Sequence, residues 1–502
     1  MSDRRKLLAI DQGTTGSTAI VLTLDGETLG KKTVEFPQHF PKPGWVEHDA
    51  DEIWKSVGEA VSGALAAAGV DGKDIGAIGI TNQRETTLVW ERATGKPIHR
   101  AIVWQCRRTA PECDRLKSEG AEPLVRDKTG LVIDAYFSGT KIAWILDEVA
   151  GARARADKGE LAFGTIDAFL VHRLTGGAVH ATDVTNASRT LLMDLAKLSW
   201  DAEMLRLFRV PEGVLPEIVP SAGPIGVTKG VGFLPDGIPI AGIAGDQQAA
   251  LFGQACFQEG DAKCTYGTGA FALMNIGSAP IASKHGLVTT VAWQIGKKGG
   301  PKTNVTYALE GSAFIAGAAV QWLRDGLGII ETAADIEPLA RKVESSDGVV
   351  FVPALAGLGA PYWDPNARGT ITGITRGTTA AHLARATLEG IAFEVWDLLD
   401  AMTKDAGRKV TALKVDGGAA KNDLLVQFQA DIAGVDAIRP VEVESTGRGA
   451  AMLAGIGAEL SDLATASKMV KVDRRFSPTI DAAAREAHLA RWRRAIEQTR
   501  SR

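Results

Sequence analysis

The chain opens with an apolar run that ends in an aspartate and continues at once into a cluster of glycine and threonine. Residues 7–18 read LLAIDQGTTGST, and a second apolar run follows without a gap. This pattern predicts two strands, over 7–10 and 19–24, joined by a tight turn. Residues 261–277, DAKCTYGTGAFALMNIG, repeat the strand–turn–strand arrangement with a Gly-Thr-Gly turn. The same architecture therefore opens each half of the chain, although the letters differ.

Between and after these hairpins, segments typical of strands and helices alternate, which predicts α/β layers. One example is the helix expected after Asp49, where a good N-cap precedes apolar residues at helical spacing. A chain of 502 residues is long enough for several domains. We place a boundary near residue 253, which gives domains over 1–253 and 254–502. Because no low-complexity linker marks it, we expect a close interface with a cleft between the domains.

The composition excludes several classes of protein. The net charge is −4, so no basic surface argues for nucleic acid. The longest apolar runs are shorter than the ~18 residues that a membrane span needs. Asp11 interrupts the apolar core that a signal peptide would require. Four cysteines in so long a chain indicate buried reduced thiols rather than disulfides, a redox pair or a zinc site. We expect a cytoplasmic globular protein.

The glycine/threonine turns present backbone N–H groups and hydroxyls that suit phosphate oxygens. The chain contains neither GxxxxGK[ST] nor GxGxxG, so it has no P-loop or dinucleotide fingerprint. Asp11 beside a phosphate suggests Mg²⁺, which binds carboxylate and phosphate oxygens. The alternative is an ordinary hairpin whose glycines serve turn geometry. Two such turns favour a nucleotide held between the domains, with DGGAAKN (416–422) as a third small-residue site near an adenosine.

An acceptor for the phosphate would need a base and groups that bind hydroxyls. Asp246 follows the apolar run in IAGIAGDQQAA, at the strand end where α/β sites usually lie. Arg84 and Glu85 follow the strand expected over IGAIGIT, and an adjacent acid and base can hold neighbouring hydroxyls of a polyol. The alternatives are a helix N-cap for Asp246 and a surface ion pair for Arg84 and Glu85.

Many ordered motifs along the whole chain resemble the FGGY family of carbohydrate kinases. They include DQGTTGS, PGWVEHD, TNQRETT, VWQCRRT, YFSGTKIAWILDE, GDQQAALFGQ, TYGTGAF, ALEGS, VPALAGLGAPYWDPNARG and VDGGAAKND. The resemblance implies two ribonuclease H-like domains of the actin/Hsp70/hexokinase ATPase type, with the active site in the cleft. The NQRET motif is similar to the branch that phosphorylates glycerol with ATP and Mg²⁺, giving sn-glycerol 3-phosphate, rather than to the pentulose and gluconate kinases.

The resemblance also assigns roles to individual residues. Beside these roles, we expect from the chemistry of the transfer that Asp246 is the catalytic base and that Asp11 positions Mg²⁺. The residues expected to hold or wall the polyol are Arg84, Glu85, Trp104, Tyr136, Asp246, Gln247 and Phe271. The residues expected at the nucleotide are Thr14, Thr15, Gly16, Thr268, Gly317, Gln321, Gly418 and Asn422. From spacing alone, Trp104 and Tyr136 would pass as packing, as would Gly317, and Gln321 would pass as a solvated helix position.

The chain departs from the family pattern at Thr18, where members commonly carry Arg, and this removes one phosphate-side cation. The loop LPDGIPI (234–240) lacks the Gly-x-Arg pattern that binds an inhibitory sugar bisphosphate in some bacterial relatives. Two other functions remain open: a family kinase for another polyol or a ketopentose, and a nucleotide-gated regulatory protein without a phosphoryl acceptor. Family analogy suggests a homodimer or homotetramer.

Overall fold

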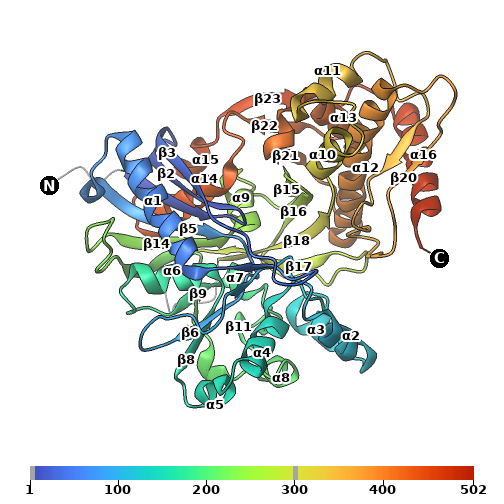
Figure 1. Cartoon of the computed structure of the whole chain (residues 1–502). Helices are drawn as coiled ribbons and strands as arrows, with labels where there is room; N and C mark the ends of the chain where they lie inside the picture. The colour runs from blue at the N-terminus through green and yellow to red at the C-terminus, as the bar shows by residue number, and fades with distance from the viewer. Residues whose placement is uncertain (1–5, 298–303, 502) are drawn as a thin grey trace.

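The computed structural model describes residues 6–297 and 304–501, and within these ranges the chain forms two large mixed sheets (Figure 1). The six-stranded sheet has the order β13 (Ala222–Val227), β14 (Pro239–Gly245), β5 (Ile75–Asn82), β1 (Lys6–Gln12), β2 (Gly16–Thr23) and β3 (Thr28–Glu35). The seven-stranded sheet has the order β17 (Val288–Gln294), β18 (Val305–Ala313), β16 (Ala270–Gly277), β15 (Asp261–Tyr266), β21 (Ala412–Asp416), β22 (Ala437–Pro440) and β23 (Val472–Phe476).

The two sheets share a central arrangement of strands, although the order in which the chain adds the edge strands differs. In the first, β1 is antiparallel to β2 and parallel to β5, and β14 continues the parallel set before the antiparallel β13. In the second, β15 is antiparallel to β16 and parallel to β21, and β22 continues the parallel set before the antiparallel β23. Each half therefore opens with the expected hairpin and pairs its first strand in parallel with a later strand, which confirms both hairpins.

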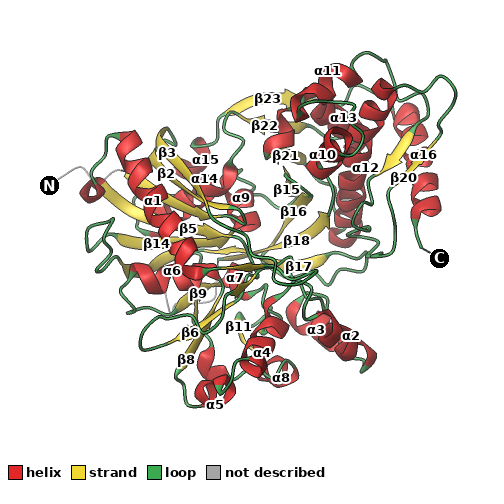
Figure 2. Cartoon of the chain, viewed as in Figure 1, coloured by secondary structure: helices red, strands yellow, loops and turns green. Residues whose placement is uncertain are grey.

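Helices cover the sheets on both faces (Figure 2). The helices of the first half are α1 (Ala50–Ala68), α2 (Ala110–Ser118), α3 (Glu122–Thr129), α4 (Ser138–Glu148), α5 (Ala152–Asp157), α6 (Ile166–Leu174), α7 (Val184–Ala187), α8 (Ala202–Leu207) and α9 (Asp246–Gly253). Those of the second half are α10 (Gly317–Asp325), α11 (Ile336–Ala340), α12 (Ala380–Ala406), α13 (Asp423–Ala433), α14 (Ser445–Gly457), α15 (Leu463–Lys468) and α16 (Ala482–Thr499). Asp49 caps α1 by accepting from the N–H groups of Asp51 and Glu52, so the expected N-cap is confirmed.

Smaller elements complete the chain. Short strands pair as β4 (Glu47–His48) with β7 (Ala101–Ile102), β6 (Leu88–Glu91) with β8 (Leu161–Gly164), β9 (Ala181–Asp183) with β12 (Glu217–Val219), β10 (Met193–Asp194) with β11 (Ser199–Trp200), and β19 (Val350–Val352) with β20 (Thr370–Thr372). The 3₁₀ turns are η1 (Gly72–Asp74), η2 (Glu212–Val214), η3 (Ala333–Asp335) and η4 (Gly418–Lys421). None of the described helices is long and apolar enough to cross a membrane.

The helix α14 belongs to the second half of the sequence but packs against the first sheet, beside β1, β5 and β14 (Figure 1). Alternate residues of β1 serve the two faces: Leu8 and Ile10 join the core under α1, and Leu7 and Ala9 join the core under α14. The approach is so close that a Cβ on Gly79 would lie 2.0 Å from the carbonyl oxygen of Ala450. Glycine is therefore required at that position of β5.

Candidate active site

Three adjacent strands of the first sheet end at one edge, and each end carries a candidate residue. Asp11 lies at the end of β1, Arg84 follows β5, and Asp246 begins α9 directly after β14. The register pairs Asn82 of β5 with Gln12 on one side and Gly245 on the other, so the three parallel strands end level. Ligands bind at this edge in open α/β sheets. The topology thus gathers three residues that are far apart in the sequence.

Arg84 is 2% exposed, and acceptors surround its guanidinium. Nη1 donates to Glu310 Oε2 at 2.6 Å and Nη2 donates to Glu310 Oε1 at 2.8 Å. Nη1 also donates to Gln248 Oε1 and Nη2 to the Tyr136 hydroxyl, each at 3.2 Å. Nε lies 3.2 Å from Asp246 Oδ1. Arg84 therefore ties the edge of the first sheet to β18 of the second.

Glu85 is also buried, at 1% exposure, so the surface ion-pair interpretation of Arg84 and Glu85 is wrong. Its Oε1 accepts from Arg189 Nε at 2.7 Å and lies 3.7 Å from Arg84 Nε. Burial raises the pKa of Glu85, and the two guanidinium groups act against that rise. The Glu85 carboxyl group is thus held by the Arg189 guanidinium, and it lies near Nε of Arg84, the atom that faces Asp246.

The backbone at Glu85 is strained, with φ at +60°, a conformation that is uncommon for any residue with a side chain. Three donors hold its carbonyl oxygen: Thr87 Oγ1 at 3.0 Å, Ser138 Oγ at 3.1 Å and Lys141 Nζ at 3.2 Å. Burial lowers the pKa of Lys141 to about 8. Such over-determined strain is typical of functional sites, and here it fixes the direction of the Glu85 side chain.

Asp246 is the first residue of α9, and the N-cap is Gly245, so the N-cap interpretation of Asp246 is wrong. Its Oδ1 accepts from the backbone N–H of Gln247 at 2.7 Å, and the side chain is 32% exposed. The Gln247 side chain is held by the buried Lys263, whose Nζ donates to Oε1 at 2.5 Å. Asp246 is thus anchored at one oxygen and open to solvent, as a proton acceptor for a bound hydroxyl must be.

Aromatic side chains line the site next to Arg84. The rings of Trp104 and Tyr136 meet edge to face with centroids 5.7 Å apart. Trp104 Nε1 donates to Thr14 Oγ1 at 3.0 Å, which joins this wall to the first hairpin. Phe271 lies half-buried on β16, opposite Ser312 of β18. Trp104 therefore contacts both Tyr136, which is expected at the polyol, and Thr14, which is expected at the phosphates.

The turns of the two hairpins are closed in the same way. In the first, Gly13 N–H donates to the Gly16 carbonyl at 2.9 Å, and Thr15 is exposed at the tip. In the second, Gly267 N–H donates to the Gly269 carbonyl at 2.9 Å, and Thr268 is exposed. Both turns thus present a threonine to solvent on a tightly folded backbone.

The start of α10 rests on the second hairpin. Ala316 and Ala318 donate their N–H groups to the Thr268 carbonyl at 2.8 and 3.1 Å. A Cβ on Gly317 would lie 2.6 Å from the Gly267 carbonyl oxygen, so only glycine permits this approach. The packing brings two of the expected nucleotide residues, Thr268 and Gly317, together.

Three further residues expected at the nucleotide also lie in the second half. Gln321 is exposed one turn further along α10, Gly418 is exposed in η4, and Asn422 caps α13 by accepting from Leu425 N–H at 2.9 Å. Within the described ranges, no hydrogen bond or ion pair joins Gln321, Gly418 or Asn422 to the polyol-side residues. The residues expected at the polyol thus gather mainly at the edge of the first sheet, and we call Arg84, Glu85, Tyr136 and Asp246 the acceptor cluster. The residues expected at the nucleotide come from both sheets, because Thr14, Thr15 and Gly16 lie in the first hairpin.

Burial and the charges of Asp246 and Glu444 raise the pKa of Asp11 to about 7. A carboxyl group that two other acids oppose in this way would suit a divalent cation bound together with a phosphate. Among the described residues, no three His, Cys, Asp or Glu side chains form a metal-binding group of their own. The donor set thus fits Mg²⁺ that takes most of its ligands from phosphate and water.

Thr18, where the resemblance implies Arg, forms a hydrogen bond with the Thr33 hydroxyl on the neighbouring strand at 2.8 Å.

All four cysteines are free and buried, as expected. Burial raises the pKa of Cys113, Cys256 and Cys264 to about 12, so these thiols are not nucleophiles.

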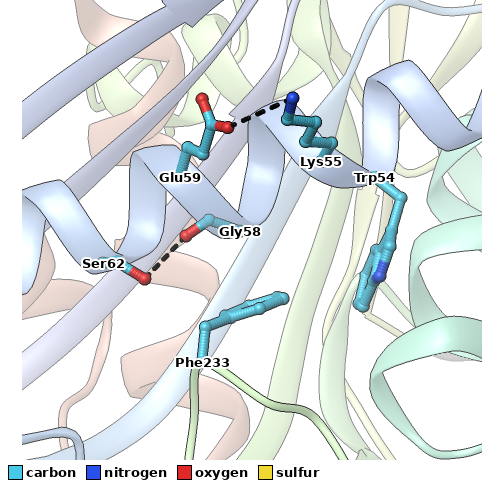
Figure 3. A pocket seen from close by; sticks show the side chains of 6 residues that line it. All are labelled: Trp54, Lys55, Gly58, Glu59, Ser62 and Phe233. Atoms are coloured by element: carbon cyan, nitrogen blue, oxygen red, sulfur yellow. Dashed lines mark hydrogen bonds and ion pairs between the residues drawn. The ribbon is translucent and has the colours of Figure 1, made fainter.

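A separate open hollow of about 460 Å³ lies on the outer side of α1 (Figure 3). It is lined by Trp54, Lys55, Gly58, Glu59, Ser62 and Phe233, none of them a candidate site residue.

Sequence reasoning missed four side chains that contact the acceptor cluster: Arg189, Gln248, Lys263 and Glu310. The signal available for Glu310 was a single acid inside the apolar strand pattern VTYALEGSA, because buried acids are rare unless they are paired. Nothing in the local pattern of Arg189, in NASRT, distinguishes it from a surface residue.

Comparison with known proteins gives consistent matches along the chain. Residues 6–253 match the N-terminal domain of the FGGY family of carbohydrate kinases, and residues 262–458 match its C-terminal domain. The chain is 58% identical to a glycerol kinase of Myxococcus xanthus, over 99% of this chain and 100% of the relative. It is 56% identical to a glycerol kinase of Deinococcus radiodurans, over 100% and 98%. The crystal structure of Plasmodium falciparum glycerol kinase with ADP superimposes with a TM-score of 0.92, at 37% identity, over 99% and 98%.

Proposed function

The chain belongs to the FGGY family of carbohydrate kinases, and we propose that it transfers the γ-phosphate of ATP to a terminal hydroxyl of glycerol, giving sn-glycerol 3-phosphate. The observation that carries this proposal is the acceptor cluster. Buried Arg84 and Glu85 and partly buried Tyr136 offer charged and hydroxyl partners for a small polyol, and partly exposed Asp246 lies 3.2 Å from Arg84 Nε. A regulatory protein without an acceptor would not need a carboxylate beside hydroxyl-binding groups.

In this reaction Asp246 accepts the proton of the attacking glycerol hydroxyl. The hydroxyl oxygen of glycerol forms a bond to the γ-phosphorus while the bond from that phosphorus to ADP breaks. General-base catalysis of this kind contributes about 10²- to 10⁴-fold. Glu85 and Arg84 orient the other hydroxyls, and the wall of Trp104 and Tyr136 excludes water from the carbon chain. The transition state of phosphoryl transfer is loose, so orientation and charge neutralisation carry most of the catalysis.

The nucleotide phosphates would lie between the two hairpins, in contact with Thr14, Thr15 and Gly16 of one and Thr268 of the other. Gly317, Gln321, Gly418 and Asn422 would form the rest of the nucleotide site. Asp11 would hold Mg²⁺ against the phosphates. When bound, this metal neutralises charge on the phosphate oxygens.

The test is ADP release from Mg·ATP with no acceptor, with glycerol, and with a panel of other polyols, ketopentoses and gluconate. We expect a large increase with glycerol and only small increases with the other acceptors. A stronger response to another acceptor would replace glycerol as the substrate but retain the kinase. ATP binding without any acceptor-dependent ADP would support the nucleotide-gated regulatory alternative instead.

A further inference from the structure

Glu310 reaches the acceptor cluster from the second sheet. It lies on β18 and is 1% exposed, and both its oxygens accept from Arg84, at 2.6 and 2.8 Å. Two parallel N–H···O bonds fix the plane of a guanidinium as well as its position. The orientation of Arg84, which lies in the first domain match, is therefore set by a residue of the second.

This orientation decides which side of Arg84 faces the open part of the site. The two terminal nitrogens point to Glu310, and the Nε edge is left 3.2 Å from Asp246. Without Glu310, the nearest carboxylate open to solvent is Asp246, and the terminal nitrogens would turn toward it. An ion pair between the terminal nitrogens of Arg84 and Asp246 would occupy the Asp246 oxygen that must accept the substrate proton.

Arg189 couples Glu310 to the second polyol-side residue. Its Nε donates to Glu85 Oε1 at 2.7 Å and its Nη2 donates to Glu310 Oε1 at 3.1 Å. The guanidinium also lies over the Phe137 ring, 5.1 Å from the centroid. Burial alone would raise the pKa of Glu310, but Arg189 and Arg84 outweigh it and lower that pKa to about 2. Two acids and two bases are thus buried as one neutral group.

We propose that Glu310 and Arg189 are positioning residues for the acceptor: Glu310 holds Arg84 and Arg189 holds Glu85, so that both meet the polyol in a fixed geometry. This inference rests on the proposed function, because it assigns Arg84 and Glu85 to the acceptor. It differs from a purely structural role, in which the buried charges would affect folding but not the affinity for one substrate.

The test is steady-state kinetics of Glu310→Gln with glycerol and ATP varied in turn. We expect KM for glycerol to rise about 10- to 100-fold, the loss expected for a charge-assisted pair of hydrogen bonds, with KM for ATP within about twofold of wild type. Glu394→Gln is the matched control, since Glu394 is a buried glutamate on α12. Burial raises the pKa of Glu394 well above its usual range, and we expect both KM values to stay unchanged in this variant.

Glu310→Asp and Arg189→Lys extend the test. Glu310→Asp keeps the charge but is one methylene shorter, so we expect a smaller rise in KM for glycerol than in Glu310→Gln. Arg189→Lys keeps the charge but cannot bond two acids in one plane, and the same substrate-specific rise is expected. If Glu310→Gln fails to fold, these two variants decide the question.

Folded variants with a wild-type KM for glycerol would overturn the proposal, as would equal rises in both KM values together with a lower unfolding temperature. The wild-type acceptor panel is measured first. If wild type prefers another acceptor, the proposed substrate fails, and the same comparison of KM values with that acceptor then decides the positioning role. If wild type uses no acceptor, the positioning role fails with it.

Discussion

Replacing Asp246 by Asn tests the catalytic assignment with the smallest structural change. Asn has the same shape, and its Oδ1 can still accept from Gln247 N–H, which donates to Asp246 at 2.7 Å. The oxygen also still faces Arg84 Nε across 3.2 Å. The position is 32% exposed and at the first turn of α9, so little packing is disturbed. We expect the variant to fold and to keep its affinity for glycerol.

We expect a loss in turnover because no neighbouring side chain can replace Asp246 as the general base. Glu85 is bonded to Arg189 at 2.7 Å and buried, so it is not available to accept a proton from the acceptor hydroxyl. Loss of a general base costs about 10²- to 10⁴-fold in rate, or about 3 to 5 kcal/mol of transition-state stabilisation. We therefore expect kcat to fall by at least about a hundredfold, with KM for glycerol within a few-fold of wild type.

The assay is ADP release at saturating Mg·ATP over a glycerol titration, which separates kcat from KM. Asp25→Asn is the matched control, because Asp25 lies exposed in the turn after β2. A kcat within about tenfold of wild type would refute the base assignment. A normal kcat with a raised KM would reduce Asp246 to a binding residue.

Three further outcomes can be measured. Trp104→Phe removes the hydrogen bond from Nε1 to Thr14, so we expect kcat/KM for both substrates to fall by about fivefold, the effect of one neutral hydrogen bond, when ADP release is measured as before. Gly79→Ala would force a Cβ against Ala450 and should lower the free energy of unfolding by more than about 3 kcal/mol in denaturant titrations, whereas Gly232→Ala, with open space around it, should not. Burial raises the pKa of Asp397 to about 7. The folded state therefore holds this proton more tightly than the unfolded state, and the stability that the proton contributes below the ordinary pKa is lost as the pH rises through 7. Between pH 5 and 8, the unfolding free energy of Asp397→Asn should therefore rise relative to that of wild type, by at most about 4 kcal/mol.

The hairpins were predictable from sequence because their signal is local. An apolar run, a glycine/threonine turn and another apolar run dictate two paired strands, and the structure pairs Asp11 with Thr18 and Thr265 with Phe271 as this requires. The cap at Asp49 is local in the same sense. Each of these features depends on residues within a few positions of one another.

The charged network was not predictable because its signal is not local. Glu310 bonds a residue 226 positions away, and Arg189 bonds Glu85 at a separation of 104. Spacing could place Arg84 and Glu85 after a strand, but it could not distinguish a surface pair from a buried one. That distinction depends on the second sheet covering them, and no pattern within TNQRETT encodes it.

The network also explains why adjacent Arg84 and Glu85 do not simply neutralise each other. Arg84 Nε lies 3.7 Å from Glu85 Oε1, whereas each side chain makes a shorter bond to a partner of its own, Arg84 to Glu310 and Glu85 to Arg189. A buried charge without a partner is costly, so both partners must be supplied by other parts of the fold. Because Glu310 comes from β18 of the second sheet, the acceptor cluster is complete only when both halves of the chain have folded against each other. The requirement for two partners thus makes the acceptor site a property of the whole chain and not of the first half alone.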